Sequence, residues 1–404
     1  MGSKDNNIMY MEYSNFKLWS VGQGLFYTGK IQSESKSFNF VYDCGGSNEN
    51  IISEAIDDYL NDFNPQKEID FLIISHFDRD HINGLHHLLK NINKIKKIFI
   101  PYSDTFNSYF LLIAYLYGNN GDLSEKVDNI ILVNTSQSKG GDGITNLDEL
   151  RLEDNIDETY KIGNISVSRL DFSSYVSLGG VWKFKFYNVL LEEALIGKVK
   201  QDIDNLVQQY RASGLEDLLS NHWNNSVKNG LKNIYDSYVP ENRGNGFKNS
   251  SQNQASLCLY HSPLIKYNDY EVVFKHINYK RYFPYFWGED NENVGTLLTG
   301  DLSLRVNEES QKYDHFRDYF SSEKDEILFF LVPHHGAMNN WNSSILTDFK
   351  NVNFFINSAG LNNRYGHPDS NVIKEILATG SNFLWTNENN CVEYGIFSFE
   401  YNYF

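Results

Sequence analysis

The sequence predicts an α/β fold, and three observations lead to this prediction. Short apolar segments typical of strands alternate with segments of helical periodicity over residues 16–100. The same alternation returns after residue 250. Between these two parts, residues 103–250 follow a different and more helical pattern. We therefore predict a single domain over residues 8–404, with residues 103–250 as a largely helical insertion.

The elements of the first part are predicted in order along the chain. Strands are expected at 16–19, 38–42, 71–74 and 95–100, and helices at 51–60 and 82–89. Asp80 or Asn83 stands near the start of the second helix. A dense polar segment follows the strand at 71–74 directly, so this strand end is the expected place for a functional site.

The rest of the chain is predicted with the same criteria. The insertion contains a helix at 109–117, a glycine-rich loop at 140–143, a strand at 181–187, a helical segment at 190–235 and a linker from 242. Six strands follow, at 256–260, 271–274, 296–299, 328–332, 353–357 and 383–385.

Composition narrows the classes of function. A net charge of -17 repels polyanions on average, which argues against a non-specific DNA-binding surface. The chain has no run of eighteen apolar residues and no signal-peptide pattern, so we expect a cytoplasmic protein that does not contact a membrane. Cys44, Cys258 and Cys391 are odd in number and widely spaced, which argues against a disulfide framework and indicates core thiols.

Four side chains of metal-ligand type stand together directly after the strand at 71–74. They are His76, Asp78, Asp80 and His81. A turn at this point can direct several of them into one pocket. The alternative, a solvated helix-capping cluster, explains single residues but not the combination. Imidazole and carboxylate together suit a divalent ion, and a set richer in Asp than the usual zinc site favours manganese without settling the choice.

The segment His76-x-Asp78-x-Asp80-His81 resembles the first metal motif of the metallo-β-lactamase superfamily, usually His-x-His-x-Asp-His. Asp78 in place of the second His is similar to the ComEC-like branch, named for the metallohydrolase domain of a DNA-uptake channel. Residues 21–24 and 41–46 resemble two further turns of that branch, although Ser20 stands where the branch usually has Asp. The resemblance covers residues 16–100 and 250–400. It implies an αββα sandwich, with two mixed sheets face to face and helices outside.

Two later motifs resemble the same branch. Gly300-Asp301 resembles its Gly-Asp motif, whose Asp commonly bridges two metal ions. Residues 332–336 resemble its paired-His motif. One of His334 and His335 is expected to bind metal, with His335 favoured, and the other to support the ligands or contact substrate. Asp43, within the turn at 41–46, is expected to have such a supporting or substrate-binding role.

The closing motif of the branch resembles residues 362–368. His367 is expected to ligate a metal ion or to contact a substrate phosphate, and Arg364 to bind phosphate or to form a surface salt bridge. The third His of the superfamily is absent, and Asn253-x-x-Ser256 stands in its region, as in the ComEC-like branch. A neutral amide there leaves one metal site with fewer strong ligands and favours a second ion that loads with substrate.

The resemblance implies a metal-dependent hydrolase with two divalent ions, Zn or Mn, that activate a water molecule. His76, Asp78, Asp301 and His335 are the expected ligands, and His81 completes the second site. Asp80 orients the activated water and takes its proton. The leading prediction is hydrolysis of a phosphodiester in nucleic acid or in a nucleotide.

Two other functions stay open at this point. The first is hydrolysis of a small phosphoester, because the branch also resembles a phosphorylcholine esterase. The second is a non-catalytic metal-binding sensor or interaction subunit whose insertion docks a protein partner. Similar stand-alone proteins occur in bacterial antiviral gene clusters, so an antiviral defence role is a hypothesis. A basic run either steers a polyanion or is a solvated helix end; it consists of Lys90, Lys94, Lys96 and Lys97.

Overall fold

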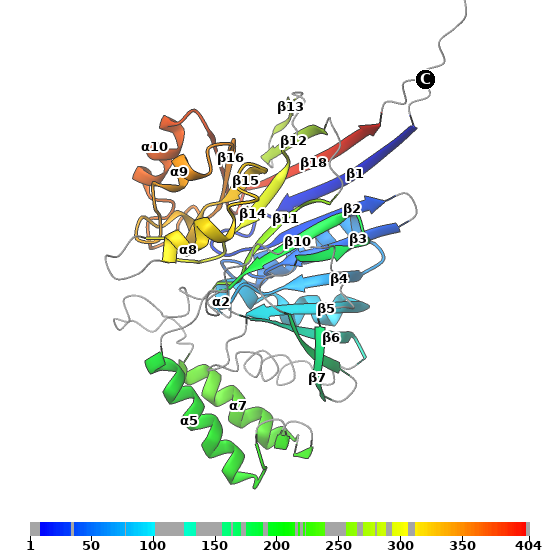
Figure 1. Ribbon diagram of the computed structural model, residues 1–404, viewed down its shortest axis with the longest axis vertical. Helices are drawn as coiled ribbons and strands as arrows, with labels where there is room; N and C mark the ends of the chain where they lie inside the picture. The colour runs from blue at the N-terminus through cyan, green and yellow to red at the C-terminus, as the bar shows by residue number, and fades with distance from the viewer. Residues whose placement is uncertain are drawn as a thin grey trace, which may run out of the picture.

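Two β-sheets form the centre of the molecule in a computed structural model (Figure 1). The structure describes residues 9–33, 36–76, 78–101, 125–134, 156–162, 165–170, 175–188, 193–214, 217–218, 221–222, 224–238, 256–264, 270–278, 281–287, 293–305 and 312–400. The predicted helix at 109–117, the loop at 140–143, the linker from 242 and Asn253 lie outside the described residues.

The first sheet has eleven strands in the order β13-β12-β18-β1-β2-β3-β4-β5-β6-β8-β7. Its strands are β1 Met9–Leu18, β2 Tyr27–Ser33, β3 Lys36–Tyr42, β4 Glu68–Ile73, β5 Lys94–Pro101, β6 Val127–Val133, β7 Ile156–Ile162, β8 Ile165–Leu170, β12 Tyr270–Asn278, β13 Arg281–Trp287 and β18 Asn390–Glu400. Pairing is parallel from β3 through β4, β5 and β6 to β8, and antiparallel elsewhere. The sheet is therefore mixed.

The second sheet has seven strands in the order β17-β16-β15-β14-β11-β10-β9. Its strands are β9 Tyr175–Leu178, β10 Trp182–Tyr187, β11 Cys258–Pro263, β14 Gly295–Leu298, β15 Ile327–Leu331, β16 Phe354–Ser358 and β17 Asn382–Thr386. The four strands from β14 to β17 are parallel, and β9, β10 and β11 are antiparallel to their neighbours. This sheet is also mixed.

Helices cover the outer face of each sheet. They are α1 Glu49–Asp58, a π-helical turn Tyr59–Phe63, α2 Arg79–Ile82, α3 Leu85–Asn91, α5 Glu193–Gln209, α7 Asn225–Tyr238, α8 Lys312–Tyr319, α9 Ile345–Asp348 and α10 Ser370–Ala378. In Figure 1, α8, α9 and α10 gather beside the second sheet, while α5 and α7 lie together at the bottom of the view. No helix among these described elements is both long and apolar enough to span a membrane.

Three buried clusters explain why the sheets stack. Along β4 the apolar side chains alternate, so Phe71 and Ile73 face the second sheet while Leu72 faces the helices. Aromatic rings fill the space between the sheets, for example Phe71 against Phe184. A second cluster lies under α1, α3, α5 and α7, and a third under α8, α9 and α10. The predicted αββα sandwich, with two mixed sheets face to face and helices outside, is confirmed.

Residues 103–250 differ from the largely helical insertion that the sequence predicts. Within the described residues, β6, β7 and β8 complete one side of the first sheet, and β9 and β10 complete one side of the second. The helical segment expected at 190–235 is two helices, α5 and α7, whose apolar side chains pack on the core of the first sheet. The described part of residues 103–250 therefore contributes strands to both sheets of the sandwich and adds the helices α5 and α7.

The predicted helix at 82–89 is divided into α2 and α3. The division falls at Asn83 and Gly84, where the Asn83 side chain donates to the Gly46 carbonyl and accepts from the Gly46 amide at 2.9 and 3.0 Å. A Cβ on Gly84 would lie 2.5 Å from the Ile52 side chain, so the chain is pressed against α1 at this point. Neither Asp80 nor Asn83 caps a helix here, since Asp78 and Gly84 occupy the N-cap positions.

Candidate metal centre

Residues 75–76 and 78–81 follow the carboxyl end of β4, and the second of these stretches leads into the helical turn α2. Their backbone is fixed by two neighbouring turns: Leu25 donates to the Asp80 carbonyl at 3.2 Å, and Cys44 donates to the His81 carbonyl at 2.8 Å. A Cβ on Gly45 would collide with the backbone of Asp80 and His81. The turn at 43–46 therefore sets the position of the metal-ligand loop by direct backbone contact.

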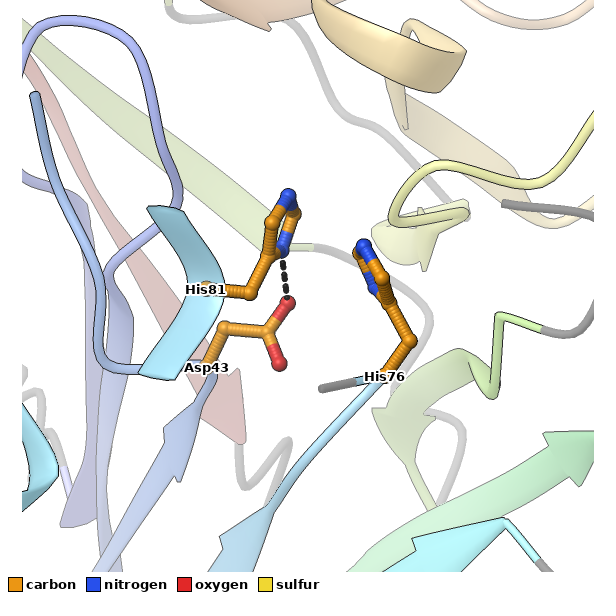
Figure 2. A group of neighbouring side chains, drawn as sticks. All are labelled: Asp43, His76 and His81. Atoms are coloured by element: carbon orange, nitrogen blue, oxygen red, sulfur yellow. Dashed lines mark hydrogen bonds and ion pairs between the residues drawn. The ribbon is translucent and has the colours of Figure 1, made fainter. Parts of the chain in front are cut away.

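Asp43 orients the loop through three hydrogen bonds. Its buried carboxylate accepts from the Ser75 amide at 2.6 Å, from the Ser75 hydroxyl at 2.5 Å and from His81 Nδ1 at 2.7 Å. Figure 2 shows the Asp43 carboxylate next to the His81 ring, with the His76 ring on the other side of the group. Asp43, His76 and His81 lie close enough to share an ion. Because the Asp43 oxygens are already engaged, we assign Asp43 to positioning His81.

Three buried histidines of the centre, His76, His81 and His335, share one hydrogen-bonding arrangement. His335 Nδ1 donates to the Ser358 carbonyl at 2.7 Å, since a carbonyl only accepts. His76 Nδ1 lies 2.8 Å from the Ser75 hydroxyl, whose single proton goes to Asp43, so this nitrogen is the donor as well. His81 Nδ1 is held by Asp43. This arrangement makes Nε2 the nitrogen that each ring offers to a metal ion once any proton on it has left, as in metal-bound histidines.

The Nε2 atoms of His76, His81 and His335 are buried and have no hydrogen-bond partner in the described part of the chain. A buried polar atom without a partner costs about 1–3 kcal/mol, so three such atoms in one place need an explanation. All three lie near the Asp301 carboxylate, at distances from 3.2 to 3.7 Å. A divalent ion bound between them would supply the missing partner.

The Asp301 carboxylate divides the cluster into two halves. Site A, on the Oδ1 side, contains His81 Nε2 at 3.2 Å, His335 Nε2 at 3.6 Å and Asp80, which lies 3.3 Å from His335. Site B, on the Oδ2 side, contains His76 Nε2 at 3.7 Å and Asp78, which lies 3.8 Å from His76. Two ligands about 2.1 Å from one ion at tetrahedral angles stand about 3.4 Å apart. The donor spacing therefore fits one ion on each side of Asp301.

Electrostatics in the cluster also favour a cation. Burial disfavours ionisation of Asp301, but the His334, His81 and His335 rings outweigh burial and hold the pKa of Asp301 well below its ordinary value. Burial opposes protonation of His81, yet Asp301 and Asp43 raise its pKa well above the ordinary value. Burial, together with the negative charges of Asp80 and Asp301, raises the pKa of Asp78 to about 7. Bound metal ions would replace the protons that these groups compete for.

The paired histidines come from a tight turn after β15. His334 and His335 both have left-handed backbone conformations, with φ of 48° and 57°, which is uncommon for residues other than glycine. Such a conformation costs on the order of 1–3 kcal/mol and is found where a site requires it. The turn brings both rings to Asp301, because His334 Nδ1 lies 3.7 Å from Asp301 Oδ2.

The remaining predicted residues form an outer rim. The ring of His367 lies 5.8 Å from the ring of His334, and Tyr365 stacks on His367 at 5.8 Å. Arg364 is exposed and contacts the Tyr365 hydroxyl at 2.8 Å. The structure therefore brings together all predicted site residues that it describes, with Arg364 and His367 outside the donor cluster.

Three orienting groups were not predicted as site residues. Ser75 stands next to the motif and was overlooked because serine is not a usual metal ligand. Ser256 links the two sides of the centre, since its hydroxyl accepts from the Asp301 amide at 3.0 Å and lies 3.3 Å from His76 Nδ1. The Ser358 carbonyl is a backbone group, so no side-chain pattern reveals it.

Asp43→Asn is expected to weaken metal binding about 10–100-fold, a typical effect of losing the partner that orients a histidine ligand. The amide group would present its own protons to Ser75 or to His81 Nδ1, which disturbs the orientation of His81. Zinc titration of the chelator-treated protein measures the change. Unchanged zinc affinity in a folded variant would show that Asp43 does not orient a ligand.

Comparisons with known proteins agree with this geometry in part. Residues 31–151 match the model of the family described as Metallo-beta-lactamase superfamily. This range contains Asp43 and the ligands of the 75–81 loop, whereas Asp301 and the paired histidines lie outside it. A search of curated proteins gives no match.

Two solved structures are similar to part of this chain. The metallo-beta-lactamase MIM-1 from Novosphingobium pentaromativorans is 10% identical, with 55% of this chain and 89% of that chain covered and a TM-score of 0.19. The FEZ-1 metallo-beta-lactamase from Legionella gormanii is 12% identical, with 55% and 91% covered and a TM-score of 0.21. Residues 31–151 are thus similar to the metallo-beta-lactamase superfamily, and the two mixed sheets and the donor cluster after β4 agree with that similarity.

Proposed function

We propose that the protein is a two-metal phosphodiesterase that acts on nucleic acid or on a nucleotide. The observation that carries the proposal is the arrangement of three buried Nε2 atoms around Asp301, with one set of donors on each oxygen of its carboxylate. Paired divalent ions are a recurrent solution for phosphoryl transfer, because the attacking and the leaving oxygen each need a positive neighbour.

The type of ligand favours a phosphoester over a softer substrate. Three of the donors are carboxylates, namely Asp78, Asp80 and Asp301, and oxygen donors suit hard divalent ions that bind phosphate oxygens. The ComEC-like resemblance of residues 76–81 and 362–368 supports a phosphodiester as substrate rather than a β-lactam.

The protein groups have distinct roles in the proposed reaction. When bound, the ions act as Lewis acids that polarise the phosphoryl group and lower the pKa of water. Asp80 is the proposed proton acceptor, since it is the most exposed of the three carboxylates at 33% and therefore faces incoming solvent. Arg364 and His367 on the rim are proposed to bind the phosphate oxygens of the substrate.

Attraction of the substrate is proposed to depend on the bound ions and the rim. Two of the four lysines in the basic run are paired with acids of the neighbouring strands, since Lys94 pairs with Asp128 at 2.5 Å and Lys96 with Asp70 at 2.6 Å. This pairing favours the structural interpretation of the run over the steering of a polyanion.

A substrate panel tests the proposal. Purified full-length protein, with bound metal verified by mass spectrometry, is assayed on single-stranded DNA, double-stranded DNA, RNA, bis-p-nitrophenyl phosphate and p-nitrophenyl phosphate. We expect hydrolysis of at least one diester, loss of that activity after chelation, and recovery on adding Zn²⁺ or Mn²⁺. Cleavage of the monoester alone would indicate a small-phosphoester hydrolase. No turnover by protein that holds metal would reject the proposed activity.

A further inference from the structure

His334 and His335 are each close to the Asp301 carboxylate, but not to the same oxygen. His335 Nε2 lies 3.6 Å from Asp301 Oδ1, whereas His334 Nδ1 lies 3.7 Å from Asp301 Oδ2. The two adjacent histidines therefore approach different oxygens of the same carboxylate. Each oxygen belongs to a different half of the donor cluster.

The donor count of the two halves is unequal without His334. Site A has two imidazole nitrogens and two carboxylates, from His81, His335, Asp80 and Asp301. Site B has one imidazole nitrogen, from His76, and the carboxylates of Asp78 and Asp301. A four-coordinate ion in site B therefore has one position left, which a further protein donor or a water molecule can fill.

His334 lies as close to the Asp301 oxygen of site B as His76 does, and His76 is already assigned to that site. His76 Nε2 and His334 Nδ1 each lie 3.7 Å from Asp301 Oδ2. This separation is too long for a hydrogen bond. It is close to the spacing of about 3.4 Å for two ligands of one tetrahedral ion.

The backbone holds His334 in this position. Its amide donates to the Gly300 carbonyl at 3.0 Å, which ties the paired-His turn to the residue before Asp301. A side chain on Gly300, whose φ is +54°, would collide with Ser256 Oγ. The His334 side chain is mostly covered, with 22% exposed. The two turns are thus packed against each other with His334 facing Asp301.

We propose that His334 binds the ion of site B through Nδ1, so that the paired histidines supply one ligand to each half of the centre. This inference rests on the proposed metal centre. His334 then has a role in holding an ion that is separate from any contact with substrate. Its neighbour His367 belongs to the rim and does not take part.

Glycine substitutions test the assignment with little risk to folding. Both histidines have positive φ, which glycine adopts without strain, so His334→Gly and His335→Gly remove the ligands and keep the turn. His367→Ala is the matched control, because its ring is next to His334 but outside both sites. Chelator-treated full-length variants are titrated with Zn²⁺ alone. Ions per chain are counted by mass spectrometry, and affinities are measured against a chromophoric chelator.

The wild type and His367→Ala are expected to bind two Zn²⁺ per chain. His334→Gly is expected to keep one ion at wild-type affinity and to bind the other at least tenfold more weakly. In a His76→Ala background, site B no longer holds its ion tightly. Adding His334→Gly should then leave the affinity of the site A ion unchanged. In a His81→Ala background, the ion that remains is that of site B, and His334→Gly should weaken the binding of that ion.

Three results would overturn the assignment. The first is that His334→Gly binds two ions at wild-type affinity. The second is that the wild type binds a single ion. The third is that adding His334→Gly to His76→Ala lowers the affinity of the site A ion. Failure of the proposed reaction gives a different result: the wild type binds two ions but hydrolyses none of the substrates. The zinc titration then still decides the role of His334.

Discussion

Asp301→Asn is expected to abolish tight binding of both metal ions and to reduce diester hydrolysis by on the order of a thousandfold or more, because several kcal/mol of transition-state stabilisation would be lost. Its carboxylate approaches the Nε2 atoms of both sites, with His81 and His335 near Oδ1 and His76 near Oδ2. An amide has no charge and only one acceptor oxygen, so it can serve one site weakly and not both.

The measurement combines ion counts with initial rates on the best diester of the panel. Asp204→Asn on α5 is the control, since it removes the same charge from an exposed position outside the centre. The control is expected to keep two ions and full activity. Two ions of wild-type affinity in Asp301→Asn would contradict the bridging role, and one tight ion would restrict Asp301 to a single site.

Folding of Asp301→Asn should be largely retained in the absence of metal. The backbone of this residue is fixed independently of its carboxylate, because its amide donates to Ser256 Oγ at 3.0 Å. Gly300, which precedes it, has a positive φ of 54° and leaves room for Ser256. Circular dichroism and thermal melting of chelator-treated protein therefore separate loss of metal from loss of structure.

The sequence predicts the centre of the fold better than its edges. Buried parallel strands such as β4 and β15 are short apolar runs followed by a polar turn, so both the strand and the ligands after it are recognisable. Edge strands are less so: β9 alternates intermediate and buried residues over only four positions. β18 and β1 pair although they lie at opposite ends of the chain, and no local pattern predicts that pairing.

The same difference holds in the metal centre. His76, Asp78, Asp80 and His81 are predictable because one short segment contains them all. The sequence offers His334 and His335 as equivalent neighbours, and only the distances in the folded chain show that they approach different oxygens of Asp301. The Ser358 carbonyl that orients His335 becomes visible only when β16 is placed beside β15.

Asp80→Asn is expected to reduce turnover by about 10²–10⁴-fold, the usual contribution of a positioned proton acceptor. Burial opposes ionisation of Asp80, but the His335 and His81 rings outweigh it and keep its pKa well below the ordinary value. Asp80 is therefore ionised at neutral pH and able to accept a proton. Asparagine has nearly the same shape but cannot accept one.

The free energy of unfolding of the metal-free Asp80→Asn variant should change by less than about 1 kcal/mol, because a third of the side chain is exposed and the substitution is nearly isosteric. Asp80 also belongs to site A, so weaker zinc binding is expected and must be separated from loss of the proton acceptor. Rates measured with rising Zn²⁺ make this separation. If Asp80 only held the ion, saturating Zn²⁺ would restore the rate; if it accepts the proton, kcat stays low at every Zn²⁺ concentration, which is the result we expect.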